Sequence, residues 1–205
     1  MVLFLLETPR FTVRPTTDDL PLRAVFLVAL ATDHRVYQLS ALLRAPEFTR
    51  WAADRSAVTL VPRPSFLAKN ERGGHRVGPV TIPAWRMGQV PHPLYPVAAL
   101  EDYLEATRDC RAAELWVHPD SLAPLGSRAL GSLLVRLVAE AEPEADLTPH
   151  QVRKYASSLA FFRSFDVDPV RRAGQWSSSR SFVLRYLVPL LAYIPCVAMG
   201  VGPGP

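Results

Sequence analysis

The chain has 205 residues, of which 49% are hydrophobic and 20% charged, so it is long enough for one core and too apolar to be disordered. Its formal net charge of +4 permits a polyanionic partner without requiring one. The two cysteines, Cys110 and Cys196, argue against a disulfide scaffold, and together with the scattered histidines they have no zinc-ligand spacing.

In chain order, a lead segment of residues 1–18 precedes a predicted buried helix over residues 20–31, in which nearly every side chain is apolar. A second helix is predicted over residues 36–43. Two short runs of strand-forming residues follow, 57–61 and 77–83, and the polar, glycine-containing stretch between them, which starts at Lys69, is typical of a turn. We expect these strands to form one small antiparallel sheet.

The C-terminal half predicts helices only. Pro96 suits the first position of a helix that runs through Thr107, and apolar residues at three- and four-residue spacing predict another over 126–142. Three more helices are expected over residues 148–162, from Asp168, and over residues 179–188.

The expected fold class is mostly α (α+β), a helical domain with one small antiparallel sheet. We expect this domain to cover residues 19–188 and a proline- and glycine-containing tail to cover residues 189–205. The apolar runs at residues 1–6 and 187–201 are too short, or too interrupted by proline, for a signal peptide or a membrane span. The sequence therefore predicts a protein that is neither secreted nor held in a membrane.

The most informative segment is Thr148-Pro149-His150-Gln151-Val152-Arg153. His150 and Arg153 are three residues apart near the start of a predicted helix, so they share a face beside free backbone N–H groups that favour an anion. An arginine clamps phosphate oxygens and a histidine transfers protons near neutral pH, so the pair suits phosphate chemistry. A solvated helix face is the ordinary alternative for such a short motif.

Four further residues belong to the same pattern, although each has an ordinary alternative. Arg35 follows the apolar helix and could simply complement its dipole, and Lys69 on the predicted turn could be a solvated charge. Trp176 precedes the last predicted helix, which carries Tyr186 four residues after Phe182. A core tyrosine with its hydroxyl at the surface is the alternative for Tyr186.

The order Arg, Lys, His-x-x-Arg, Trp, Tyr resembles the tyrosine recombinase, or phage integrase, family. The resemblance covers about Leu20 to Leu187 and implies the helical catalytic domain of that family. The segments Leu94-Tyr95-Pro96-Val97-Ala98-Ala99-Leu100 and Ala173-Gly174-Gln175-Trp176-Ser177-Ser178 are similar to those of recombinases from DIRS-like and crypton-like mobile elements.

The resemblance implies a role for each residue. Tyr186 is expected to attack a phosphate of double-stranded DNA and form a 3′-phosphotyrosyl link, with Arg35 and Arg153 on the non-bridging oxygens. Lys69 is expected to protonate the departing 5′-oxygen and His150 to assist proton transfer at the tyrosine. Trp176 is expected to donate its indole N–H to the phosphate, where many relatives have histidine. No metal and no cofactor are implied.

As partners, the resemblance implies double-stranded DNA and further copies of the chain, as a tetramer on DNA, in the nucleus of a eukaryote or otherwise in the cytoplasm. The family's N-terminal core-binding domain is not expected, because only about twenty residues precede the first helix. The family often has an acid a few residues after the first arginine, where this chain has Gln38. We expect Asp33 to neutralise the charge of Arg35 in part. We also expect the lack of the acid to loosen the orientation of the Arg35 side chain.

Two other hypotheses remain open. In the first, the chain is a catalytically silent DNA-binding relic, or a domesticated protein, with the same fold. In the second, it is a helical protein with no DNA role, and the six site residues are scattered in the fold. A trapped covalent adduct separates the first alternative from an active enzyme, and the geometry of the six residues tests the second.

Overall fold

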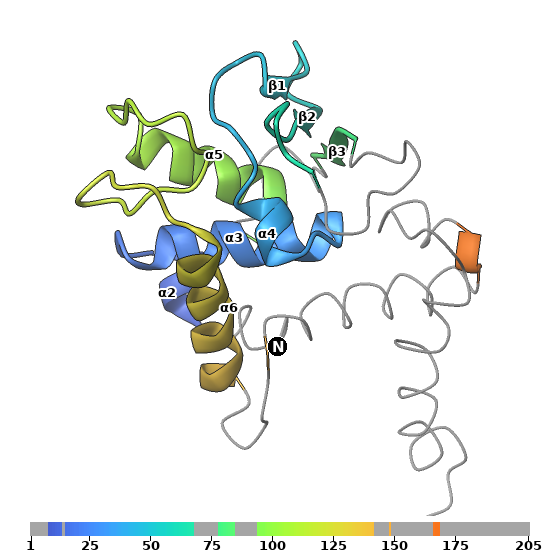
Figure 1. Ribbon diagram of the computed structural model, residues 1–205. Helices are drawn as coiled ribbons and strands as arrows, with labels where there is room; N and C mark the ends of the chain where they lie inside the picture. Colours follow the sequence, from blue (N-terminus) through green and yellow to red (C-terminus); the bar gives the residue numbers. More distant parts are fainter. Residues whose placement is uncertain are drawn as a thin grey trace, which may run out of the picture. The chain divides into compact units, whose positions relative to one another are not determined.

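The computed structural model describes residues 8–13, 15–67, 78–84, 94–141, 148 and 166–168 (Figure 1). The chain divides into two compact units, residues 1–153 and 154–205. Nearly all the described residues lie in the first unit. None of its described helices is both long enough and apolar enough to cross a membrane.

The centre of the first unit is α3 (Asp19–Thr32), which packs against helices on several sides (Figure 1). Its apolar residues point in all directions around the axis, which is the pattern of a fully buried helix. The helix begins where Asp19 Oδ2 accepts hydrogen bonds from the backbone N–H and the hydroxyl of Thr16, at 3.2 and 2.7 Å. It ends at Asp33, whose left-handed backbone (φ 54°) turns the chain away.

Four described helices contact α3. They are α2 (Pro9–Thr12), α4 (Val36–Leu39), α5 (Pro96–Ala106) and α6 (Ser127–Ala141). The apolar stripe of α6, at three- and four-residue spacing, is buried against the core, as the sequence predicted. The predicted proline start of α5 is confirmed, since Pro96 occupies its first turn.

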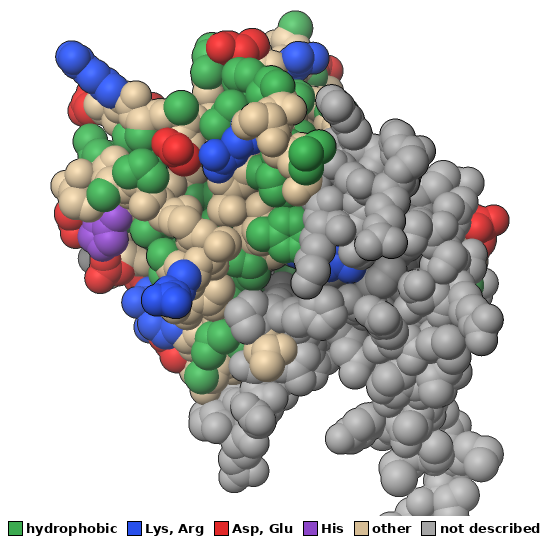
Figure 2. Space-filling view, viewed as in Figure 1, with side chains coloured by type: hydrophobic (Ala, Val, Ile, Leu, Met, Phe, Trp, Pro, Cys, Tyr) green, Lys and Arg blue, Asp and Glu red, His purple; other side chains and the backbone are tan. Residues whose placement is uncertain are grey.

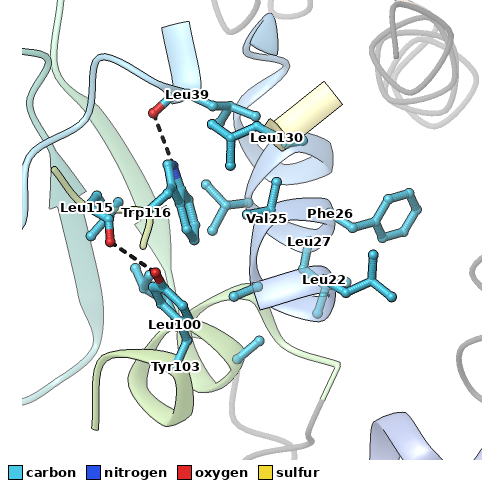
Figure 3. Close-up of a cluster of buried hydrophobic side chains, with 14 of the residues drawn as sticks. Leu22, Val25, Phe26, Leu27, Leu39, Leu100, Tyr103, Leu115, Trp116 and Leu130 are labelled. Carbon is cyan, nitrogen blue, oxygen red and sulfur yellow. Dashed lines mark hydrogen bonds between the residues drawn. The ribbon is translucent and has the colours of Figure 1, made fainter. Parts of the chain in front are cut away.

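The buried side of α5 is tied to the loop that follows it (Figure 3). The Tyr103 hydroxyl lies 2.9 Å from the Val117 carbonyl oxygen and 3.3 Å from that of Leu115, and it accepts a hydrogen bond from the Val117 N–H. Trp116 packs on the Tyr103 ring, with the ring centroids 5.4 Å apart, and its indole N–H donates to the Leu39 carbonyl oxygen at 3.0 Å. Two large aromatic side chains are thus buried with their polar atoms paired.

The sheet is antiparallel and has the order β1-β2-β3, with strands Thr49–Trp51, Ala57–Leu60 and Val80–Pro83. Val58 and Ile82 are register partners and both are buried, so one face of the sheet covers the core. The expected class is therefore confirmed: the described part of the chain is mostly helical with one small antiparallel sheet.

The structure corrects the predicted helix over residues 36–43. Helix α4 spans only Val36–Leu39, because the backbones of the next two leucines pair elsewhere. Leu42 pairs with Pro62, and Leu43 pairs with Glu114, in short antiparallel bridges. Leucines at such spacing fit a helix and a buried extended segment equally well, so the periodicity alone was misleading.

Two elements were not predicted. Strand β1 has only three residues, with exposed Arg50 in its middle, and gives almost no alternating pattern. Helix α2 lies within the predicted lead segment, yet its Phe11 is fully buried. Buried Arg23 of α3 donates from Nη1 to the Phe11 carbonyl oxygen at 2.9 Å and forms an ion pair with Asp102 of α5, so α2 is fixed to the core. The predicted turn from Lys69 lies outside the described residues, as do nearly all of the predicted helices after residue 142.

Candidate functional site

Of the six predicted site residues, the structure describes one, Arg35. The other five lie outside the described residues and stay predictions: Lys69, His150, Arg153, Trp176 and Tyr186. Within the described residues, the predicted site is therefore represented by Arg35 and its neighbours.

The Arg35 backbone is fixed by the helix that it opens. Arg35 is the N-cap of α4, and its carbonyl oxygen accepts the first hydrogen bonds of the helix, from Gln38 N at 2.8 Å and Leu39 N at 3.0 Å. In return, the Gln38 side chain reaches back, and its Oε1 accepts a hydrogen bond of 2.7 Å from the Arg35 N–H. This is the returning half of a capping box. The absence of an acid at this position does not loosen the Arg35 backbone, because the neutral amide makes the bond.

The Arg35 side chain is half-buried and lies beside an aromatic pair. Its Nη1 donates to the Tyr37 hydroxyl at 3.4 Å. The Tyr37 ring contacts the Phe66 ring, with centroids 5.8 Å apart and planes tilted by 32°. Phe66 comes from the segment after β2, so the contact joins two parts of the chain that are far apart in sequence. Sequence reasoning missed Tyr37 because no local pattern marks it.

A groove lies between α4 and α6 next to this arginine. It is open, has a volume of about 680 Å³, and includes Tyr37 in its lining. Most of its other lining residues form a stripe on α6: Ser127, Arg128, Ser132, Val135 and Arg136. Residues 128, 132 and 136 are four apart and therefore lie above one another on the helix. That spacing was visible in the sequence, but nothing there showed which face of the helix is exposed.

The two groove arginines differ in their partners. Arg136 Nε lies 3.9 Å from Glu140 Oε1, a loose pair within one helix. Arg128 is exposed and forms no ion pair within the described part of the chain. Figure 2 shows that basic and acidic side chains are mixed on the face in view, so the described surface there is not a uniformly positive field. Any anion would be bound by individual arginines.

A second polar cluster brings together residues that are far apart in sequence. Ligand atoms of exposed Asp18, His118 and Asp120 lie within 4.8 Å of one another, and Figure 2 shows a histidine with acidic side chains beside it. The Asp120 backbone N–H donates to His118 Nδ1 at 3.3 Å. Nδ1 is thus already the acceptor of a local hydrogen bond, and exposed acidic groups of this kind are common without an ion. We assign no metal to this cluster.

Comparison with known proteins gives a likeness of fold. No protein-family model matches the sequence, and no curated protein matches it significantly. Among solved structures, the chain is similar to the XerH site-specific recombinase bound to a palindromic difH substrate, with a TM-score of 0.59 and 14% identity. The match covers 87% of this chain and 47% of XerH, so the chain spans about half the length of that protein.

Two further solved structures share the fold. The XerA recombinase has a TM-score of 0.54 and 15% identity over 86% of this chain and 63% of its own. The Tn1549 transposon integrase, in complex with transposon right end DNA, has a TM-score of 0.50 and 13% identity over 85% of this chain and 58% of its own. At these identities the likeness shows the fold: the chain adopts a fold that site-specific recombinases share.

Proposed function

We propose that this chain is the catalytic domain of a tyrosine recombinase and that it breaks and rejoins double-stranded DNA. The observation that carries the proposal is the likeness in fold to recombinases, two of which are bound to DNA. The order of the six residues along the sequence resembles the same family and does not depend on this likeness. Agreement between an ordered set of six residues and a shared fold is stronger support than either alone.

In the proposed reaction, the Tyr186 phenolic oxygen attacks the scissile phosphorus. A bond to that oxygen forms while the bond to the 5′-oxygen breaks, which leaves a 3′-phosphotyrosyl link and a free 5′-hydroxyl. Attack of a 5′-hydroxyl on the same link reverses the step, so the phosphodiester energy is kept. Lys69 supplies the proton to the departing 5′-oxygen, and His150 takes part in proton transfer at the tyrosine.

Arg35 has the geometry for the charge-stabilising role in this scheme. Its backbone is held by the helix cap, and its guanidinium is half-buried beside a neutral hydroxyl. A held guanidinium costs little reorganisation when negative charge builds on the non-bridging oxygens. Arg153 is proposed to act on the same oxygens, and Trp176 to donate its indole N–H.

The chain connectivity supports a place for Lys69 near Arg35. Phe66 contacts Tyr37, which in turn accepts the hydrogen bond from Arg35. Only two residues separate Phe66 from Lys69 in the sequence. Three residue steps reach at most about 11 Å even when extended, and a lysine side chain adds to that reach. One phosphate within range of both residues is therefore compatible with the fold.

We also propose that a DNA backbone follows the groove between α4 and α6. Arg128 and Arg136 are eight residues apart on α6, which corresponds to roughly 12 Å along the helix axis. At that separation they contact different phosphates. Such contacts position DNA without reading its sequence, and they weaken as salt rises. Assembly as a tetramer on DNA belongs to the same proposal.

The test is a covalent trap. The full chain is incubated with a library of nicked duplexes, in which the short fragment after cleavage diffuses away and prevents rejoining. We expect a protein–DNA adduct that survives detergent and disappears after protease treatment, none with Tyr186→Phe, and a normal amount with the matched control Tyr193→Phe. If the wild-type chain forms no adduct on any member of the library, the enzymatic proposal fails. Salt-dependent DNA binding without an adduct would then indicate a silent relic.

A further inference from the structure

Tyr37 links the Arg35 guanidinium to another segment of the fold. The Tyr37 hydroxyl accepts the hydrogen bond from Arg35 Nη1 at 3.4 Å, and its ring contacts Phe66. All three side chains are half-buried. The hydroxyl is therefore held by a ring whose own position is set from another segment of the chain.

An ordered hydrogen-bond partner restricts the conformations of the Arg35 side chain. The helix cap fixes its backbone through Gln38, but it does not fix the four side-chain torsions that follow. An arginine side chain loses much of its rotamer freedom when it is held in one geometry. A partner that is already ordered lowers the extra cost of ordering the guanidinium at the moment of reaction.

The chemistry of the partner also matters. A tyrosine hydroxyl is a neutral acceptor at neutral pH, whereas a carboxylate would offset part of the arginine charge. A hydroxyl bonded to Nη1 engages one of the several N–H donors of the planar fork. Tyr37 thus orients the cation and retains its charge for the substrate.

We propose that Tyr37 is a positioning residue for Arg35, and that its hydroxyl sets the direction in which the guanidinium meets the scissile phosphate. The proposal rests on the proposed function for the identity of the substrate. It goes beyond that function because Tyr37 is not one of the six residues in the family pattern. The Tyr37–Phe66 contact also ties this orientation to the segment that follows β2.

Three variants separate the parts of this arrangement. Tyr37→Phe removes the hydroxyl and keeps the ring contact, whereas Phe66→Leu weakens the ring contact and keeps the hydroxyl. Ser40→Ala is the matched control: it removes a hydrogen bond of the same helix, from Ser40 Oγ to the Tyr37 carbonyl oxygen at 2.9 Å, without touching the guanidinium. Each variant is first checked for a thermal transition close to that of the wild type.

On nicked DNA, we expect Tyr37→Phe to slow adduct formation about tenfold, the equivalent of one lost hydrogen bond, while the DNA dissociation constant changes less than about twofold. Phe66→Leu is expected to slow it less, and Ser40→Ala not at all. In an Arg35→Lys background, Tyr37→Phe is expected to have no further effect. An equal slowing in both backgrounds, or a wild-type rate for Tyr37→Phe, overturns the proposal.

A second measurement does not depend on DNA cleavage. In ¹⁵N-edited spectra of the full chain, the Arg35 Nε–H signal is assigned by its loss in Arg35→Lys. We expect Tyr37→Phe to shift this signal and to speed its exchange with water, and Ser40→Ala to leave it in place. If Tyr37→Phe leaves it unchanged, the positioning role is wrong whether or not the protein cuts DNA. If the wild type forms no adduct while the signal responds as expected, the proposed function fails and the Tyr37–Arg35 coupling stands.

Discussion

Gln38 accepts, through Oε1, a hydrogen bond of 2.7 Å from the backbone N–H of Arg35. Gln38 is only 3% exposed, so this amide is buried with the backbone group that it satisfies. The bond fixes the backbone of the N-cap residue of α4 and, with it, the point from which the Arg35 side chain starts. A polar residue in the core is thereby explained by the helix end that it caps.

The first prediction concerns this cap. Replacement of Gln38 by leucine keeps the size of the side chain and removes the acceptor, which leaves the Arg35 N–H without its partner. We expect the free energy of unfolding to fall by about 1 to 2 kcal/mol, measured by urea denaturation. Glu105→Gln, at an exposed position of α5, is the control and is expected to stay within about 0.5 kcal/mol of the wild type. A midpoint for Gln38→Leu equal to that of the control would show that the cap contributes nothing.

The second prediction concerns Tyr103. Its hydroxyl accepts from the Val117 N–H and lies 2.9 Å from the Val117 carbonyl oxygen, so Tyr103→Phe leaves two buried backbone groups without this partner. We expect a loss of about 1 to 3 kcal/mol of unfolding free energy at pH 7. An unchanged unfolding midpoint at pH 7 would mean that other groups satisfy the Val117 backbone.

The burial of Tyr103 also predicts that the unfolding free energy depends on pH. Burial raises the pKa of Tyr103 from its ordinary 10.0 to about 12. Because the folded state holds the proton more tightly than the unfolded chain, this contribution to stability is fully present below pH 10.0 and is lost as the pH rises toward about 12. Over this pH window, we expect the unfolding free energy of the wild type to fall by about 2 to 3 kcal/mol more than that of Tyr103→Phe. Parallel stability curves for the two proteins above pH 10.0 would contradict the assignment.

A third prediction follows from the unequal burial of an ion pair. The Arg23 side chain is 1% exposed, whereas that of its partner Asp102 is 54% exposed. Asp102→Asn therefore removes a surface charge but leaves the charge of Arg23 in the core. We expect this variant to lose on the order of 2 kcal/mol, several times the usual value for a surface pair.

The exposed pair between Arg108 and Glu105 is the control for this comparison. Its two side chains are 69% and 72% exposed. Glu105→Gln is expected to change the unfolding free energy by less than about 0.5 kcal/mol. Equal effects of Asp102→Asn and Glu105→Gln in chemical denaturation would show that the burial of Arg23 does not govern the pair.

The sequence predicted the long helices well because their signals are local. Pro96 and the leucine spacing of α6 place both helices within one or two residues of their observed bounds. The errors have a common physical cause. The end of α4 at Leu39, and strand β1, depend on backbone pairing with segments far away in sequence, which no local pattern records.

In the candidate site, too, local sequence signals were predicted and long-range contacts were not. Arg35 was predicted from the order of residue types along the chain, and its local structure adds a helix cap. Tyr37 was not predicted, because its contact with Phe66, which is 29 residues away, leaves no local pattern. The exposed face of α6 was missed because helical spacing shows that Arg128 and Arg136 share a side but does not show that α4 forms the other wall of a groove.

The last prediction tests that groove. If Arg128 contacts a DNA phosphate, Arg128→Ala removes about one released counterion, and the slope of log affinity against log salt becomes shallower by about 0.9. Since the contact is to the backbone, the loss of affinity is expected to be similar for duplexes of different sequence. Arg128 is a sharper probe than Arg136, because Arg136 lies 3.9 Å from Glu140, so its removal also breaks a contact within the helix.

Arg111→Ala is the matched control, since it removes the same charge from an exposed position outside the groove. Both variants lower the net charge of the chain by one, so a general electrostatic effect weakens binding equally in the two proteins. A specific contact changes the slope only for Arg128→Ala. Equal slopes for the two variants, measured by fluorescence anisotropy over a series of salt concentrations, would place the DNA backbone elsewhere on the molecule.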